Sequence, residues 1–161
     1  MPKLLIVGIN GSPNREGNTS FLLQQALDEC VTRGADTEVL FCREVFKDQR
    51  NPFCIACSSP CTGKCYKNKE LANAYELISR ADGLILGSPV YFGTVSAQLK
   101  TFFDKSRVLR TEKKLLNVVG GAITSGASRF GGQETTIRAM HDIMLVHGML
   151  IIGDGYHEDD C

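Results

Sequence analysis

Four cysteines lie close together in this sequence, at Cys54, Cys57, Cys61 and Cys65, out of seven in the whole chain. Thiolates are the usual ligands of iron–sulfur clusters and of structural zinc. Structural zinc more often uses two Cys-x-x-Cys pairs that a longer spacer holds apart, whereas four thiols in one compact loop suit a cubane cluster. The spacing therefore favours a 4Fe–4S cluster, and zinc, reduced thiols and a redox disulfide remain as alternatives.

A polar, glycine-containing segment from Gly11 to Ser20 follows the first apolar run of the chain. Free backbone N–H groups and the positive end of a helix dipole together form an anion site when a helix begins in such a loop. The segment is not a Walker loop, because Asn18 occupies the position where lysine is required, and it lacks the Gly-x-Gly-x-x-Gly dinucleotide fingerprint. The sequence predicts a phosphate site with side-chain donors from Ser12, Asn14, Asn18, Thr19 and Ser20.

Two further polar loops follow later apolar runs, at Gly87–Ser96 and at Thr124–Glu134. The first contains a rigid proline, a Tyr91-Phe92 pair and Gly93, which suit a flat and partly apolar ring. The second supplies glycines and hydroxyls that can reach the polar rim of a planar heterocycle. Because the carboxyl ends of parallel strands meet at one edge of a sheet, the three loops together predict a pocket for a phosphorylated planar cofactor.

The elements that position these loops alternate between continuous apolar runs and segments with helical periodicity. Strands are predicted at 4–9, 37–41, 81–87, 115–123 and 148–152, helices at 19–33, 70–80, 95–106 and 133–146, and an inserted cysteine loop at 42–68. Strands separated by helices imply a parallel sheet with helices on both faces. We therefore expect one α/β domain over 1–161, a flavodoxin-like three-layer sandwich with strand order 2-1-3-4-5.

The charge and hydropathy of the chain exclude several classes of protein. Its 18 basic and 18 acidic residues give a formal net charge of zero, which argues against nucleic-acid or membrane-surface binding. The N-terminus lacks the features of a signal peptide, and no stretch approaches the ~20 apolar residues that span a bilayer. We expect a cytoplasmic protein whose thiols stay reduced. No helix is predicted after the last strand, so a partner subunit or further chain is expected to cover that face.

Three segments give the chain a specific resemblance to a known family. They are Gly11-Ser12-Pro13 with Gly17-Asn18-Thr19, the run from Ser88-Pro89-Val90-Tyr91-Phe92-Gly93 to Lys100, and Gly131-Gly132-Gln133-Glu134. In this order and over nearly the whole chain, they resemble the NAD(P)H-dependent FMN reductases of the flavodoxin-like proteins. The cysteine loop resembles that of the iron–sulfur flavoproteins, a branch of the same family, although here three residues rather than two separate Cys57 from Cys61.

The resemblance implies a function and a set of binding residues. It implies that FMN phosphate binds at the first loop and that the isoalloxazine ring contacts Pro89, Val90, Tyr91, Phe92, Gly93, Thr124, Ser125, Gly126 and Gly131. It implies NAD(P)H as electron donor, a quinone, flavin or redox protein as acceptor, and a homodimer or homotetramer. We expect no dedicated catalytic side chain, because the cofactors carry the chemistry. The alternative is a non-enzymatic electron carrier that a ferredoxin reduces.

Overall fold

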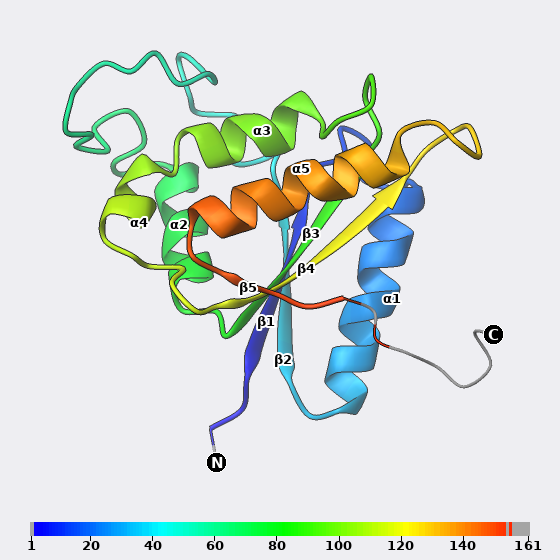
Figure 1. Cartoon of the computed structure of the whole chain (residues 1–161). Coiled ribbons are helices and arrows are strands. Elements are labelled where there is room, and N and C mark those ends of the chain that lie inside the picture. Colours follow the sequence, from blue (N-terminus) through cyan, green and yellow to red (C-terminus); the bar gives the residue numbers. More distant parts are fainter. Residues whose placement is uncertain (1, 154, 156–161) are drawn as a thin grey trace.

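The computed structural model describes residues 2–153 and 155, which form one five-stranded parallel sheet with helices on both faces (Figure 1). The strands are β1 (Leu5–Asn10), β2 (Asp36–Phe41), β3 (Gly83–Pro89), β4 (Val119–Ser125) and β5 (Leu150–Ile151). The helices are α1 (Asn18–Thr32), α2 (Glu70–Ser79), α3 (Ala97–Asp104), α4 (Arg107–Thr111) and α5 (Gln133–Val146). The strand order β2-β1-β3-β4-β5 confirms the predicted flavodoxin-like topology.

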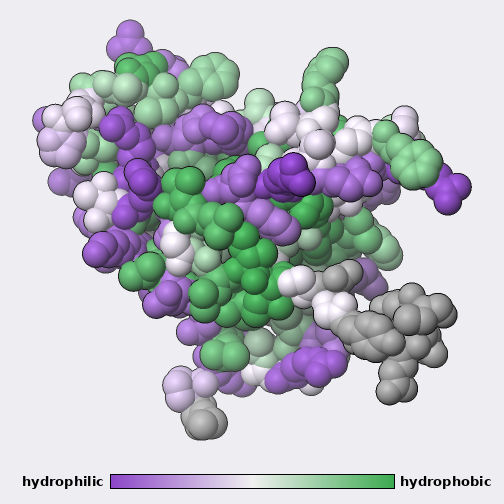
Figure 2. All heavy atoms as spheres, viewed as in Figure 1, coloured by the Kyte–Doolittle hydropathy of each residue, from purple (hydrophilic) through white to green (hydrophobic). Residues whose placement is uncertain are grey.

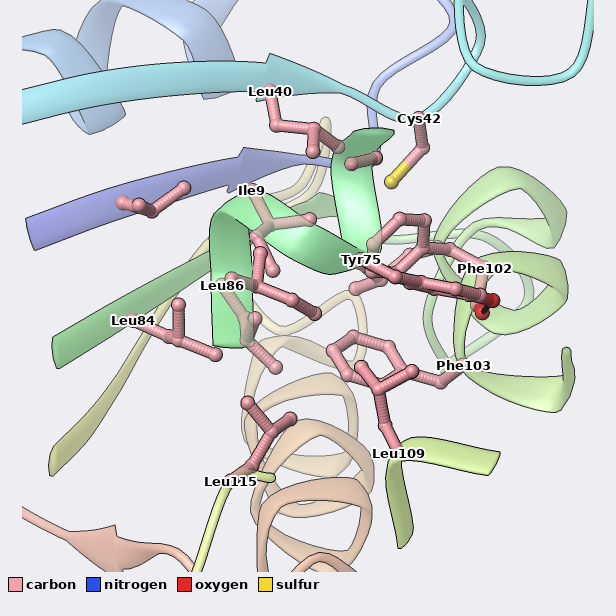
Figure 3. Packing of buried hydrophobic residues seen from close by; sticks show 14 of the residues in the cluster. Ile9, Leu40, Cys42, Tyr75, Leu84, Leu86, Phe102, Phe103, Leu109 and Leu115 are labelled. Carbon is pink, nitrogen blue, oxygen red and sulfur yellow. Dashed lines mark hydrogen bonds between the residues drawn. The ribbon is translucent and has the colours of Figure 1, made fainter. Parts of the chain in front are cut away.

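The two faces of the sheet are covered by different helices. The main hydrophobic cluster combines alternate residues of β1 and β3, such as Val7, Ile9 and Leu86, with residues of α2, α3, α4 and α5. Figure 3 shows Tyr75 and Phe102 of this cluster packed beside Cys42. On the opposite face, the glycines of β1 and β3 bring α1 close to the sheet. A Cβ at Gly8 would lie only 2.9 Å from Leu27 Cδ1. Alternating side chains on the buried strands thus hold helices on both faces.

The structure corrects three element boundaries. The predicted strand at 115–123 begins only at Val119, because Lys113 and Asn117 have positive φ angles and the chain turns there. Leu115, which is fully buried, belongs to that turn and not to the sheet. The predicted helix at 95–106 ends at Asp104 and is followed by the separate short helix α4. The last strand pairs through two residues only. None of these changes moves a loop away from the edge where it was expected.

The carboxyl ends of the strands place the chemistry-bearing loops along one edge of the molecule. The loops after β1, β3 and β4 lie near one another, whereas the loop after β2, which contains the cysteines, projects beside α3 and α4 (Figure 1). Residues 42–68 contain no helix or strand, as predicted. In the part of the chain that the structure describes, no helix combines the length and the apolar character needed to cross a membrane.

Candidate functional site

The loop between β1 and α1 is shaped by side chains that bind its own backbone. Asn10 is fully buried, and it donates from Nδ2 to Ser20 Oγ (2.8 Å) and accepts the Ser12 N–H at Oδ1 (2.8 Å). Ser12 Oγ in turn accepts the N–H of Asn14 (3.1 Å). Helix α1 begins after Gly17 without a side-chain cap. Its first-turn N–H groups, which have no intrahelical acceptor, therefore remain available for an anion.

The first loop is locked to the loop after β3. The Gly11 N–H donates to Gly87 O (2.7 Å), and the buried hydroxyl of Ser96 donates to Gly11 O (2.5 Å). Ser96 also donates its own N–H to Ser88 Oγ (2.9 Å). A Cβ at Gly11 would lie 2.7 Å from Leu99 Cβ, so the close approach of the two segments requires glycine.

The loop after β4 is tied to both of the others. The Val90 N–H donates to Ser125 O (2.9 Å), and Thr135 at the start of α5 donates from Oγ1 to Gly93 O (2.6 Å). The hydroxyls of Thr19 and Ser125 are 3.3 Å apart, which links the beginning of α1 to the end of β4. The three loops thus form one hydrogen-bonded platform.

All of the predicted cofactor-binding residues lie on this platform. Those that are buried or half-buried are Ser12, Thr19, Ser20, Pro89, Val90, Gly93, Thr124 and Ser125, and those that are exposed are Asn14, Asn18, Tyr91, Phe92, Gly126 and Gly131. The side chains of Tyr91 and Phe92 are 45% and 105% exposed, so the platform presents aromatic surface to solvent. An uncapped helix start beside exposed aromatic rings fits a phosphorylated planar molecule. The Gly131 N–H is already donated to Gln133 Oε1 (2.9 Å).

Sequence reasoning missed the residues that hold the platform together. Asn10 lies just after the predicted strand at 4–9, and Thr135 lies within the predicted helix at 133–146; neither was predicted to take part in the site. The available signal was a polar amide directly after a run of buried apolar residues, because a buried amide needs partners and an adjacent loop provides them. Asn10 positions the binding groups from a fully buried site, whereas Thr135 is exposed and ties the loop after β3 to the start of α5.

The cysteine loop is anchored to the core at its C-terminal end. The Tyr66 ring packs edge-on against Tyr75 with centroids 4.9 Å apart, and the Tyr75 hydroxyl donates to Phe102 O (2.6 Å). Gly63 has a φ of +67°, and a Cβ there would lie 2.8 Å from the Tyr66 hydroxyl. Burial raises the pKa of Tyr66 to about 12, and the neighbouring cysteines add to this rise. These contacts fix the chain around Cys65.

The four cysteines line a single cavity of about 230 Å³. Cys54 and Cys57 are exposed, whereas Cys61 and Cys65 are half-buried. In residues 2–153 and 155, no group of three or more histidine, cysteine or acidic side chains is arranged to hold a metal ion. The donor chemistry fits a thiolate-bound metal centre, but the sulfur atoms of this conformation do not form a coordination site.

Two observations inside this cavity favour an anionic occupant. The hydroxyl of Ser58 is buried and finds no hydrogen-bond partner among the described residues. The charged residues that line the cavity are all basic: Arg50, Lys64, Lys69, Lys105 and Arg107. Burial raises the pKa of Cys65, an effect that Lys105 opposes and that Cys57 and Cys61 reinforce. Cys57, Cys61 and Lys105 are therefore within electrostatic reach of Cys65.

A separate polar pair lies at the far end of α5. Ser106 donates its hydroxyl to Phe103 O (2.7 Å), so its contact with His147 Nε2 (2.9 Å) requires the imidazole to donate. Burial, together with the charge of Arg110, lowers the pKa of His147 and so favours the neutral ring. The histidine follows the C-terminus of α5, whereas the platform adjoins its N-terminus. This pair therefore belongs to the framework and not to the platform.

Comparison with known proteins identifies the family. The family model described as NADPH-dependent FMN reductase matches residues 4–158. The chain belongs to this family. An iron–sulfur flavoprotein of Methanocaldococcus jannaschii is 46% identical over 151 residues, which cover 92% of this chain and 76% of that protein. An iron–sulfur flavoprotein of Methanosarcina thermophila is 39% identical over 155 residues, which cover 94% of this chain and 78% of that protein.

Solved structures agree on the fold of this FMN reductase family member. A flavodoxin, WrbA-like protein from Agrobacterium tumefaciens matches with a TM-score of 0.65 and 20% identity, over 96% of this chain and 80% of that one. An NADH:FMN oxidoreductase matches with a TM-score of 0.68 and 21% identity, over 94% of this chain and 73% of that one. At these identities the likeness establishes the fold alone. The predicted family and the predicted fold class are both confirmed.

Proposed function

We propose that this chain is an FMN-dependent oxidoreductase that accepts electrons from NAD(P)H. Electrons would pass through FMN, and through a 4Fe–4S cluster, to a small acceptor such as a quinone, a flavin or a redox protein. The observation that carries the proposal is the hydrogen-bonded platform, which combines an uncapped helix start with exposed aromatic surface. Membership in the NADPH-dependent FMN reductase family supports the same chemistry.

The first loop would hold the FMN phosphate. The hydroxyls and amides of Ser12, Asn14, Asn18, Thr19 and Ser20 surround the first turn of α1. Hydrogen bonds to a dianion are stronger than those between neutral groups, so a few donors fixed in advance suffice without a lysine. Asn10 would hold Ser12 and Ser20 in place through the two bonds that it makes to them.

The other two loops would orient the isoalloxazine ring. Pro89, Val90, Tyr91, Phe92 and Gly93 would provide its apolar contacts, and Thr124, Ser125, Gly126 and Gly131 its polar rim. Thr124 Oγ1 already donates to Ser88 O (2.7 Å), so this residue offers its hydroxyl oxygen as an acceptor. FMN, when bound, supplies the hydride-accepting and electron-transfer chemistry. The protein's part is to bind the ring in one orientation and to keep one face accessible.

Cys54, Cys57, Cys61 and Cys65 would hold the cluster. The most similar of the relatives described above are iron–sulfur flavoproteins, and the cavity offers thiols, the unpartnered Ser58 hydroxyl and an excess of positive charge. Thiolates and the sulfides of a cluster are anions, so basic surroundings stabilise them. Zinc fits the same donors, and metal analysis of protein purified without oxygen distinguishes the two.

Stopped-flow mixing of the FMN-loaded protein with NADPH or NADH tests the reductase function. We expect the absorbance of oxidised flavin to disappear with at least one of the two nucleotides. Ser20→Ala, which removes one proposed phosphate donor, should weaken FMN binding, whereas Ser79→Ala, which removes a hydroxyl bonded only within α2, should not. Bound flavin that neither nucleotide reduces would contradict the reductase function.

A second candidate function is a non-enzymatic electron carrier that a ferredoxin reduces. The exposure of Cys54 and Cys57 favours it, because a redox protein could approach the metal centre closely. Steady-state oxidation of NADPH separates the two functions, since a carrier would consume almost none.

We also propose that the chain assembles into a homodimer or homotetramer in a reducing, cytoplasmic compartment. Figure 2 shows hydrophobic surface over the end of α5 and over β5, where Leu145, Val146, Leu150 and Ile152 are more than half exposed. Contiguous apolar surface of this kind usually marks an interaction site. Sedimentation equilibrium should give a mass of two or four chains, and a monomer at micromolar concentration would contradict the proposal.

A further inference from the structure

Lys105 is a buried cation that pairs with no carboxylate in the part of the chain that the structure describes. It directly follows α3 and is 3% exposed. Its ammonium donates to Gln49 Oε1 (3.1 Å) and to the backbone oxygen of Asn51 (2.6 Å), both neutral acceptors. Among the ion pairs of residues 2–153 and 155, none includes Lys105. Burying a charge is costly unless an opposite charge compensates it.

The cavity of the cysteine loop lies directly beside this ammonium. Lys105 lines it together with all four cysteines, and the other charged residues of the lining are also basic. Among residues 2–153 and 155, no carboxylate lines the cavity to balance Lys105. The four cysteines are the residues of the lining that acquire negative charge when they bind a metal centre.

We propose that Lys105 is a positioning residue whose buried ammonium is the counter-charge of the metal cluster and raises the reduction potential of that cluster. The inference deepens the proposed function and rests on the cluster that it assigns to the four cysteines. One-electron reduction adds a negative charge to a cluster that is already anionic. A fixed positive charge in a poorly hydrated site stabilises the reduced form more than the oxidised form, and so favours reduction.

A structural role must be separated from this electrostatic one, because Lys105 also ties the segment at 49–51 to the end of α3. Lys105→Arg keeps the charge and hydrogen-bond donors, whereas Lys105→Met keeps the apolar stem and removes the charge. Lys69→Met is the matched control. Lys69 lines the same cavity and donates to Asp48 O (3.0 Å), but it is half-exposed, so solvent screens its charge.

The experiment is a redox titration of the iron-loaded, full-length variants with dithionite, followed by electron paramagnetic resonance of the cluster. For Lys105→Met we expect the equilibrium constant for one-electron reduction to fall about tenfold, a shift of about 59 mV to lower potential. Lys105→Arg should stay near the wild-type potential, and Lys69→Met should shift it much less than Lys105→Met. If Lys105→Met loses its iron, Lys105→Gln, which removes the charge but keeps an N–H donor, replaces it, and we expect the same fall in potential.

Three results would overturn the inference. They are an unchanged potential in Lys105→Met, an equal shift in Lys69→Met, and loss of iron from Lys105→Arg as well, which would indicate a purely structural role. Failure of the proposed function gives a different result. In that case the wild-type protein itself contains no iron and shows no cluster signal, before any variant is compared.

Discussion

The platform and the cysteine loop lie at the same edge of the sheet but are built in opposite ways. On the platform, buried side chains such as Asn10 and Ser96 satisfy the backbone of three loops, and the segments pack too closely for a larger residue at Gly11. In the cysteine loop, the contacts with the rest of the protein lie around Tyr66 and around Asn51, whose backbone oxygen Lys105 binds. Cys54 and Cys57, which lie between these two points, are exposed. The first region is held together by contacts among protein groups. The second has its donors and charges gathered, and we expect its ligand to order it.

The largest expected effect comes from disturbing the tightest contact of the platform. Gly11→Ala places a Cβ 2.7 Å from Leu99 Cβ and should lower the free energy of unfolding by about 1–3 kcal/mol. It should also weaken FMN binding, because the first loop must move. Gly121→Ala is the control, since nothing lies within 4 Å of a Cβ there. Urea unfolding measures both variants, and equal losses would refute the close-packing argument.

Removing the metal should change the cysteine loop and leave the platform unaltered. We expect chelation to increase amide hydrogen exchange in residues 50–64 by about tenfold, equivalent to about 1.4 kcal/mol of local stability. Exchange in residues 87–96 should not change, because their hydrogen bonds involve only protein groups. Mass spectrometry of exchanged peptides gives both values. An equal response in the two regions would remove the distinction between them.

A single hydroxyl tests how the loops are coupled. Ser96→Ala removes the bond to Gly11 O and the cap on the Leu99 N–H, and should cost about 1 kcal/mol of stability. FMN affinity should fall as well, because the first loop loses its tie to the second. Ser79→Ala removes a hydroxyl bond within α2 and should leave FMN affinity unchanged. Fluorescence titration of FMN compares the two variants, and unaltered affinity in Ser96→Ala would show that the tie is dispensable.

The smallest effect concerns the framework pair. Because burial lowers the pKa of His147 in the folded protein, the unfolded chain takes up a proton first as the pH falls below about 6.5. This histidine therefore stabilises the fold above that pH and less below it. His147→Gln should reduce the loss of stability between pH 7.5 and 5.5. The protonation of His147 should not affect FMN affinity over that range, because this residue lies away from the platform. Thermal unfolding at several pH values measures the slope, with His141→Gln as the comparison.

The strands and helices were predicted correctly from the sequence wherever the spacing of apolar residues followed their burial. Continuous apolar runs such as that at 4–9 predicted buried strands, and the strand order then brought the three loops to one edge. It failed at 113–117, because a fully buried Leu115 looks the same in a turn as in a strand. It could not reveal Lys105 as a buried cation, because a lysine in a helical pattern normally faces solvent. The residue types predicted which side chains would bind the cofactors. Only the packing of distant segments showed which other residues hold those side chains in place.

The central claim is that the start of α1 binds a phosphate and that the Tyr91 loop binds the ring attached to it. Fluorescence titration of the ligand-free protein with FMN and with riboflavin, which lacks the phosphate, tests this directly. We predict binding of FMN at micromolar concentration or below, and binding of riboflavin weaker by about 100-fold, or roughly 2.7 kcal/mol. Equal affinity for the two flavins, or no binding of either, would contradict the account.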